Sequence, residues 1–227
     1  MVAEHQIQKP WVLFDHVHSS NGFTAIGLNM DFRIRVDPEG QYIYVEFKGS
    51  DGLSDWFHNL LAIPQTIEPI EGCGFRVHRG FNRVWQSGGD YILCALEGFL
   101  SRRQFQDFKV AFTGFSHGGP LAVLASNQWF HQTNRVEDCI IFGSPKVAHG
   151  HNAVTALQRT AHHIHWANQQ DAVIHVPPRK WGFEDINRVF VSVPGNRPWS
   201  ILNIWGQHQA YGRDEIYPDP LPRPWAA

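Results

Sequence analysis

Hydrophobic and polar positions follow two spacings along this chain, one typical of strands and one typical of helices. Polar and apolar residues alternate over 41–47, which predicts a strand. From Phe81 to Phe99 apolar residues recur every three or four positions, which predicts a helix with a break at Gly88-Gly89. Similar patterns predict strands over 110–113, 139–142, 162–167 and 188–193, and helices over 120–130 and 152–159. Strands that alternate with helices indicate an α/β fold with a mostly parallel central sheet flanked by helices.

Length and charge narrow the class of protein. The 227 residues, 43% of them hydrophobic, can bury the core of one large domain, and we find no internal repeat or linker. We therefore expect a single domain over residues 1–227. The formal net charge is −2 and like charges form no long run, so nucleic-acid binding is not expected.

The ends of the chain bear on its location. The start of the sequence lacks a basic segment followed by an apolar one, and no uncharged apolar run is long enough to span a membrane. These patterns predict a cytoplasmic protein without a signal peptide or transmembrane segment. The proline-rich stretch 219–225 is expected to lie extended on the surface.

Cysteine and histidine spacings do not indicate a metal site. Cys73, Cys94 and Cys139 are too far apart for a zinc motif, so we expect free thiols. In the predicted strand over 162–167, His163 and His165 share one face and His162 lies on the other, and no carboxylate or thiol is at ligand spacing. The two histidines of 16–18 have the same weakness as metal ligands. We expect no metal and no organic cofactor.

The pentapeptide Gly114-Phe115-Ser116-His117-Gly118 is the strongest chemical signal. It follows a predicted strand and precedes a predicted helix, which is the setting of a nucleophile elbow in α/β-hydrolases. A serine hydroxyl needs a histidine to take its proton and a carboxylate to orient that histidine. Ser116 is therefore the candidate nucleophile.

In α/β-hydrolases the acid and then the histidine follow the serine along the chain. Asp171 comes directly after a predicted strand, and His208 is the last histidine. His175, the other histidine after Asp171, lies in an apolar run before two prolines, so we interpret it as structural.

Six separate segments, in the same order, resemble motifs of the class 3 (fungal-type) lipase family. They are 48–50, 55–60, 77–81, 114–119, 142–147 and 171–178. The resemblance implies a Ser116, Asp171, His208 triad and an oxyanion hole formed by Ser50 and the backbone N–H of His117. Phe115 stands where the family usually has histidine, and His117 where it usually has leucine.

The resemblance also implies a mobile amphipathic lid over about 51–64. Four apolar residues of this segment recur at helix-face spacings: Trp56, Phe57, Leu60 and Leu61. An ordinary surface helix packed on the core is the alternative for this segment.

Together these features predict a serine carboxylic-ester hydrolase, a lipase or esterase, that acts on a lipid or similar ester through an acyl-enzyme. A phospholipase A1 or an acyltransferase would use the same triad. A catalytically silent lipid-binding module is the alternative from another class, and reactivity of Ser116 toward a phosphonate would distinguish it.

Overall fold

The computed structural model of the protein describes residues 30, 32–49, 67–69, 74–168, 170–186, 189–193 and 208, and of 67–69 and 189–193 it describes the backbone only. Six described strands form the main sheet. They are β1 (Phe32–Asp37), β2 (Tyr42–Phe47), β5 (Lys109–Phe115), β6 (Glu137–Phe142), β8 (Ala161–Asn168) and β10 (Val189–Val193). Their order is β1-β2-β5-β6-β8-β10, and only the pair β1 and β2 is antiparallel. The predicted, mostly parallel sheet is confirmed.

Strand β2 illustrates how the alternating pattern is used. Its core-facing residues, all fully buried, are Ile43, Val45 and Phe47. Glu46 on the opposite face is also fully buried and forms ion pairs with Arg33 at 2.6 Å and Arg35 at 3.1 Å, both from β1. A buried carboxylate is tolerated because it is paired in this way. Strand β1 itself was not predicted, because it is short and alternates two arginines with apolar residues, of which only Phe32 is buried and Ile34 and Val36 are partly buried.

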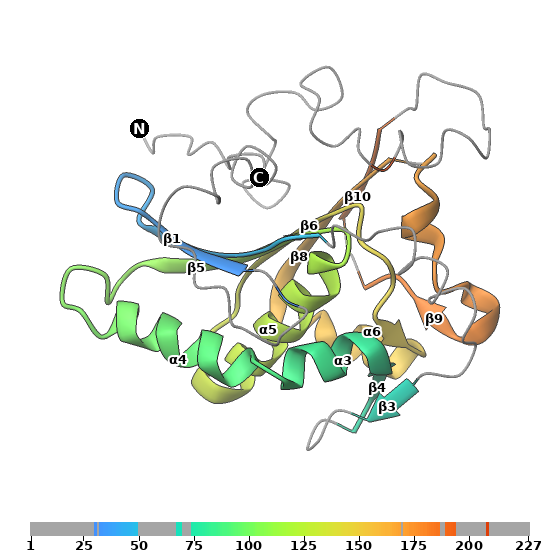
Figure 1. Cartoon of the computed structure of the whole chain (residues 1–227), viewed down its shortest axis with the longest axis horizontal. Coiled ribbons are helices and arrows are strands. Elements are labelled where there is room, and N and C mark those ends of the chain that lie inside the picture. Colours follow the sequence, from blue (N-terminus) through green and yellow to red (C-terminus); the bar gives the residue numbers. More distant parts are fainter. Residues whose placement is uncertain are drawn as a thin grey trace.

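Four described α-helices lie on one side of the main sheet (Figure 1). They are α3 (Arg79–Gln86), α4 (Gly89–Leu100), α5 (Gly118–Thr133) and α6 (His151–Leu157). The helix predicted over 81–99 is thus two helices, separated by a turn at Ser87 and Gly88. Helix α5 is buried along most of its length, and it begins at Gly118, two residues after the candidate nucleophile. None of the described helices has both the length and the apolar character of a membrane span.

A second, small sheet was not predicted. It consists of β3 (Ile67–Pro69), β4 (Arg76–His78), β7 (Ala148–His149) and β9 (Phe183–Glu184), all antiparallel. Strands of two or three residues are too short to show a periodic pattern, and they pair segments that are far apart in sequence. This sheet lies beside α3 and α6 (Figure 1).

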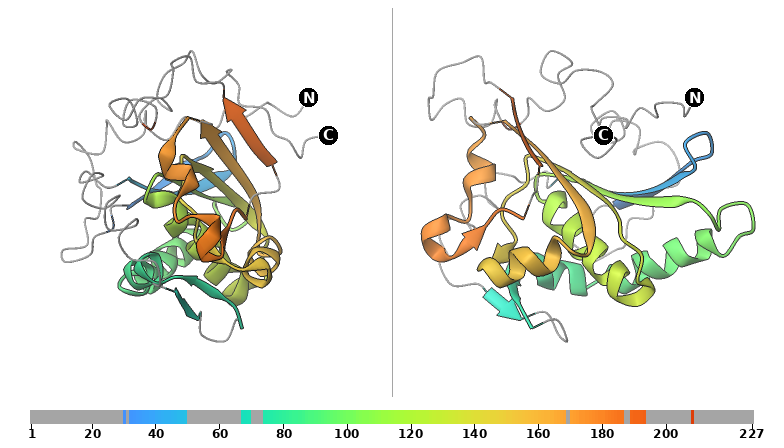
Figure 2. Two further views of the ribbon diagram at one scale, coloured as in Figure 1. Left: turned by 90° about the vertical axis from the view of Figure 1, so that its right-hand side faces the viewer. Right: turned by 180° about the vertical axis from the view of Figure 1, so that it is seen from behind.

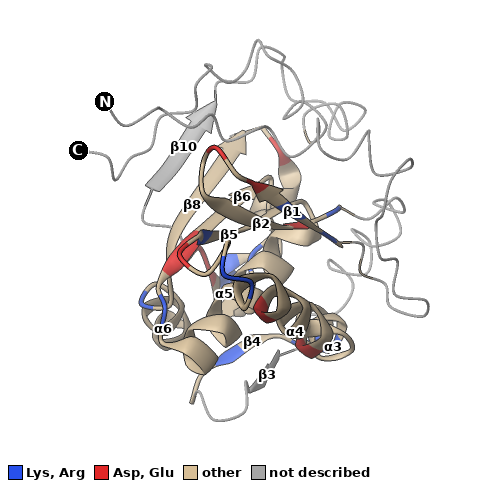
Figure 3. Ribbon diagram, turned by 90° about the vertical axis from the view of Figure 1, so that its left-hand side faces the viewer, with Lys and Arg blue, Asp and Glu red and all other residues tan. Residues whose placement is uncertain are grey.

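Two short 3₁₀ helices, η1 (Ala172–His175) and η2 (Arg179–Trp181), follow β8. The right-hand view of Figure 2 shows this orange region, together with β9, at one end of the described structure. Since the chain leaves β8 at Asn168, this is the end at which the parallel strands terminate. In Figure 3 acidic and basic segments are interspersed along the described elements.

Candidate active site

Ser116 lies between β5 and α5 in a conformation that few residues adopt. Its φ angle is +53°, in the left-handed region, and its side chain is fully buried. Its backbone N–H donates to Phe142 O at 2.9 Å, and its carbonyl accepts from Gly119 N–H at 2.9 Å. A non-glycine residue held at positive φ is characteristic of functional sites. No described residue gives Ser116 Oγ a hydrogen bond.

The glycines of the motif are required by close backbone approaches. A Cβ at Gly114 would overlap the carbonyl of Gly118, and a Cβ at Gly118 would overlap the carbonyl of Phe47. Strand β5, the start of α5 and the end of β2 therefore meet closely at Ser116 only because both positions lack a side chain. This is the geometry that the elbow motif predicts.

Asp171 follows β8 by three residues and caps η1. Its Oδ1 accepts from Val173 N–H at 2.9 Å, and its own N–H donates to Asn168 O at 2.9 Å. The carboxylate is fully buried. A buried carboxylate that accepts a backbone N–H has a fixed direction, so the second oxygen has a defined target.

That target is His208. The structure brings its Nδ1 to within 2.8 Å of Asp171 Oδ2, with both side chains fully buried. The carboxylate is an acceptor, so Nδ1 carries a proton and donates it in this bond. In the neutral imidazole Nε2 is then the basic nitrogen, which is the tautomer that a general base requires.

The ring of Phe115 connects the elbow with this pair. It stacks on the imidazole of His208, with centroids 4.8 Å apart and planes inclined by 21°. Because Phe115 directly precedes Ser116, the contact brings His208 to the elbow. From the sequence Phe115 was notable only as a departure from the family pattern, and no local signal predicted the stack.

His117, the residue after Ser116, is buried and packs against Phe81, with ring centroids 5.5 Å apart. Burial lowers its pKa to about 4. The pKa of His78 is also lowered to about 4, mainly by burial and secondarily by the charge of His117. His78 Nδ1 accepts from Gly80 N–H at 3.2 Å, so it caps α3, as expected of a structural histidine.

The remaining predicted site residues, Ser50 and the lid residues Trp56, Phe57, Leu60 and Leu61, lie outside the described residues. The last described residue before Ser50 is nevertheless close to the elbow. A Cβ at Gly49, the residue before Ser50, would be 3.2 Å from Ser116 Cβ. The segment that follows β2 therefore passes close to the candidate nucleophile.

Two of the histidines of β8 have backbone partners. His165 Nε2 accepts from Ser144 N–H at 3.0 Å, and His163 Nε2 is 2.9 Å from Leu157 O. Burial lowers the pKa of His165 to about 4. In the part of the chain that the structure describes, no group of three His, Cys, Asp or Glu side chains could hold a metal ion.

Comparison with known proteins gives relatives among lipases. A lipase of Rhizomucor miehei is 27% identical over 62% of this chain and 39% of its own. A secreted mono- and diacylglycerol lipase of Malassezia restricta is 26% identical over 78% of this chain and 60% of its own. This chain thus spans roughly two fifths to three fifths of the length of these relatives.

Solved structures share the fold. The native Rhizomucor miehei lipase propeptide complex superposes with a TM-score of 0.67 at 21% identity, covering 79% of this chain and 57% of that one. A triacylglycerol lipase with a serine-protease triad at its catalytic centre has a TM-score of 0.67 at 19% identity, covering 78% of this chain and 66% of that one. The predicted α/β-hydrolase fold is confirmed.

The expectation of a cytoplasmic location is wrong. It rested on a short pattern at the start of the sequence, whereas the secreted lipase of Malassezia restricta matches over 78% of the chain. That relative points to an extracellular location.

The family assignment rests on a match that covers far more of the chain than any single motif does. The model of the family described as Lipase (class 3) matches residues 44–181, which is more than half of the chain and includes both Ser116 and Asp171. The chain therefore belongs to the class 3 lipase family.

Proposed function

We propose that this chain is a serine carboxylic-ester hydrolase that acts on lipid esters within a single α/β-hydrolase domain. The observation that carries the proposal is the 2.8 Å contact between His208 Nδ1 and Asp171 Oδ2, which joins residues 37 positions apart beside the elbow of Ser116. A buried Asp–His pair next to a serine at positive φ is the arrangement that activates a serine hydroxyl.

In the first half of the proposed reaction, Ser116 Oγ attacks the acyl carbon of the ester. His208 Nε2 takes the hydroxyl proton as the C–O bond forms, and Asp171 stabilises the resulting imidazolium through Nδ1. When the tetrahedral intermediate collapses, the bond to the leaving alcohol breaks and His208 returns the proton to that alcohol. The acyl group is then bound to Ser116 as an ester.

In the second half, water replaces the alcohol. His208 takes a proton from the water, whose oxygen attacks the acyl carbon, and the bond to Ser116 Oγ breaks as His208 returns the proton to it. The products are a carboxylic acid and the free enzyme. No step requires a metal or an organic cofactor.

The negative charge of both tetrahedral intermediates requires fixed donors. We assign this role to the backbone N–H of His117, at the start of α5, and to Ser50, which follows the contact between Gly49 and Ser116. Each such donor contributes on the order of 3 to 4 kcal/mol to transition-state stabilisation. The low pKa of His117 keeps its imidazole neutral near pH 7, so it adds no charge beside the nucleophile.

Acylglycerols are the proposed substrate class. Support comes from relatives named as mono- and diacylglycerol lipases and from the apolar residues of the predicted lid, Trp56, Phe57, Leu60 and Leu61. An apolar lid that opens at a lipid surface would give access to a water-insoluble ester.

The test compares wild type with Ser116→Ala on p-nitrophenyl butyrate and on a monoacylglycerol emulsion. Loss of the nucleophile should lower turnover on the order of 10⁶-fold with the fold intact. Ser126→Ala is the matched control, because it removes another buried hydroxyl, on α5, that bonds to Val123 O at 2.9 Å and lies beside Cys139 rather than beside His208. Equal activity of wild type and Ser116→Ala would refute the proposal.

Further substrates and a covalent probe separate the alternatives. Release of the sn-1 fatty acid from phospholipid, without release from acylglycerol, would identify a phospholipase A1, and transfer of the acyl group to an added alcohol in preference to water would identify an acyltransferase. A Ser116 that does not react with a fluorophosphonate would favour a lipid-binding module.

A further inference from the structure

Lys146 is a buried cation close to the proposed acid. It lies between β6 and β7, and only 5% of its surface is exposed. Burial lowers the pKa of its ammonium group. Burying an ammonium group is costly unless it is hydrogen-bonded and paired, so its partners indicate what the position does.

Among the described residues, both hydrogen bonds that Lys146 donates end on the segment that carries Asp171. Its backbone N–H donates to Val176 O at 2.8 Å, and its side-chain Nζ donates to Ile174 O at 2.9 Å. The last carbonyls of a helix have no partner within the helix, and Ile174 O belongs to this group in η1. Lys146 therefore holds the C-terminal end of η1, while Asp171 caps its N-terminal end.

Residues 171–176 are thus held at both ends. At the first end, Asp171 Oδ1 accepts from Val173 N–H, so the carboxylate and the turn move together. At the other end, Lys146 contacts Ile174, three residues from Asp171. Any shift of this short turn would change the direction of Asp171 Oδ2 toward His208.

One acidic and one basic side chain act on the ammonium group of Lys146. Asp185 faces it and raises its pKa, partly offsetting the effect of burial, while Arg179 lowers it. Arg179 in turn pairs with Asp185 at 3.0 Å.

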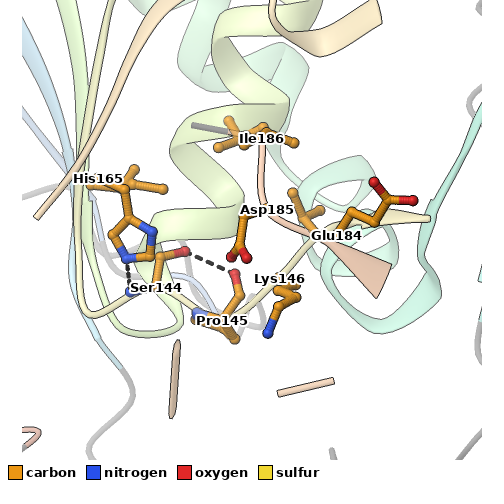
Figure 4. A pocket seen from close by; sticks show the side chains of 10 residues that line it. Ser144, Pro145, Lys146, His165, Glu184, Asp185 and Ile186 are labelled. Carbon is orange, nitrogen blue, oxygen red and sulfur yellow. Dashed lines mark hydrogen bonds between the residues drawn. The ribbon is translucent and has the colours of Figure 1, made fainter. Parts of the chain in front are cut away.

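Figure 4 shows Lys146, Asp185 and His165 around a cavity of about 10 Å³, roughly the space that one water molecule needs. His165 is neutral at ordinary pH because burial lowers its pKa to about 4, so it does not repel the ammonium group strongly.

We propose that Lys146 is a positioning residue that fixes the direction of Asp171 toward His208 by holding the end of η1 through Ile174 O. This inference rests on the proposed ester-hydrolase function, since it assigns Lys146 a role in the same site. A lysine with a purely structural role would stabilise the fold without affecting the Asp171–His208 contact.

The experiment compares Lys146→Met, which keeps the apolar stem and removes the donor, with Lys146→Arg, which keeps a charged donor. One readout is independent of catalysis: the low-field NMR resonance of the His208 Nδ1 proton, assigned by its loss in Asp171→Asn. The other is the separation of kcat from KM on a soluble ester. Arg179→Gln is the matched control, because it removes a neighbouring cation whose side chain bonds Asp185 rather than η1.

The proposal expects the resonance of Lys146→Met to shift upfield or broaden. It also expects kcat to fall on the order of 10- to 100-fold with KM within about twofold, because small errors of alignment lower the rate of the chemical step. Lys146→Arg should restore both, and Arg179→Gln should resemble wild type. If Lys146→Met does not fold, Lys146→Gln replaces it, since it keeps an N–H donor without the charge, and a partial change in both readouts is then expected.

A folded Lys146→Met with an unchanged resonance and kcat would overturn the proposal, even if its melting temperature were lower. Failure of the proposed function gives a different result: wild type would hydrolyse no ester, while the resonance would still report whether Lys146 controls the Asp171–His208 contact.

Discussion

Phe115 stacks on His208 with ring centroids 4.8 Å apart, so the residue before the candidate nucleophile supports the imidazole of the candidate base. The family usually has a polar histidine at this position, and the exchange for phenylalanine gives His208 a flat apolar neighbour. An aromatic stack restricts the rotation of the imidazole ring, while the bond from Nδ1 to Asp171 Oδ2 fixes its tautomer. The two contacts together define where Nε2 points.

Replacing Phe115 with leucine should weaken catalysis without unfolding the protein. A stacked aromatic pair contributes about 0.5–1.5 kcal/mol beyond its buried area, so kcat is expected to fall about 2- to 10-fold. Steady-state kinetics on a soluble ester measure this, with Phe115→Tyr as the variant that keeps the ring. Equal losses in the leucine and tyrosine variants would show that ring stacking is not the cause.

Asp171→Asn should abolish most of the activity while the fold remains. An amide can present its N–H₂ to His208 Nδ1 and so favour the wrong tautomer, and we expect kcat to fall about 10⁴-fold. Single-turnover hydrolysis together with circular dichroism separates this from unfolding. Asp90→Asn is the control, because Asp90 is an exposed acid on α4 that accepts from Gln128 at 2.6 Å. A loss of less than tenfold in Asp171→Asn would contradict the assignment of the acid.

Gly114→Ala should inactivate and destabilise the protein. The added Cβ would overlap the backbone of Gly118, so the elbow must open, at a cost of about 2 kcal/mol or more. Gly98→Ala is the matched control, since a Cβ there meets nothing within 4 Å and α4 should gain about 0.5–1 kcal/mol. Urea unfolding of both variants measures the difference, and equal stabilities would refute the role of the close approach.

Stability should fall in mild acid because of buried histidines. The pKa values of His78, His117 and His165 are about 4 in the folded state, against an ordinary value of 6.5. The unfolded chain therefore binds more protons than the folded one between these values. The free energy of unfolding is then highest above about pH 6.5 and decreases as the pH falls toward 4, by up to about 3 kcal/mol for each such histidine.

Urea titrations between pH 7 and pH 4.5 test this dependence. His117→Leu, which restores the usual residue of the family, should make the decrease less steep. Ile43→Val is the control, because it removes a methyl group from the fully buried core of β2 and should lower stability by a similar amount at every pH. A His117→Leu variant with the slope of wild type would show that His117 does not contribute to the acid sensitivity.

The local pattern of apolar and polar residues predicted the helices and strands in which buried residues recur at a regular spacing. The spacing of apolar residues predicted β2, β5, β6, β8 and β10 and the helices on the sheet, because burial repeats every two residues in a strand and every three to four in a helix. The elbow at Ser116 was visible for the same reason: its glycines and the strand before it are adjacent in the chain. The small sheet and β1 were missed, because very short strands and partly buried ones carry little periodic signal.

The sequence by itself thus determined the family, the elbow and the types and order of the side chains needed for ester hydrolysis. The family resemblance named Asp171 and His208 as partners, but only the tertiary structure gave the geometry of their contact and two contacts that no motif predicted: Phe115 with His208, and Lys146 with the turn that carries Asp171. The physical reason is that periodicity encodes which face of an element is buried, whereas a contact between residues 28 or 37 positions apart depends on how the whole sheet places the strand ends.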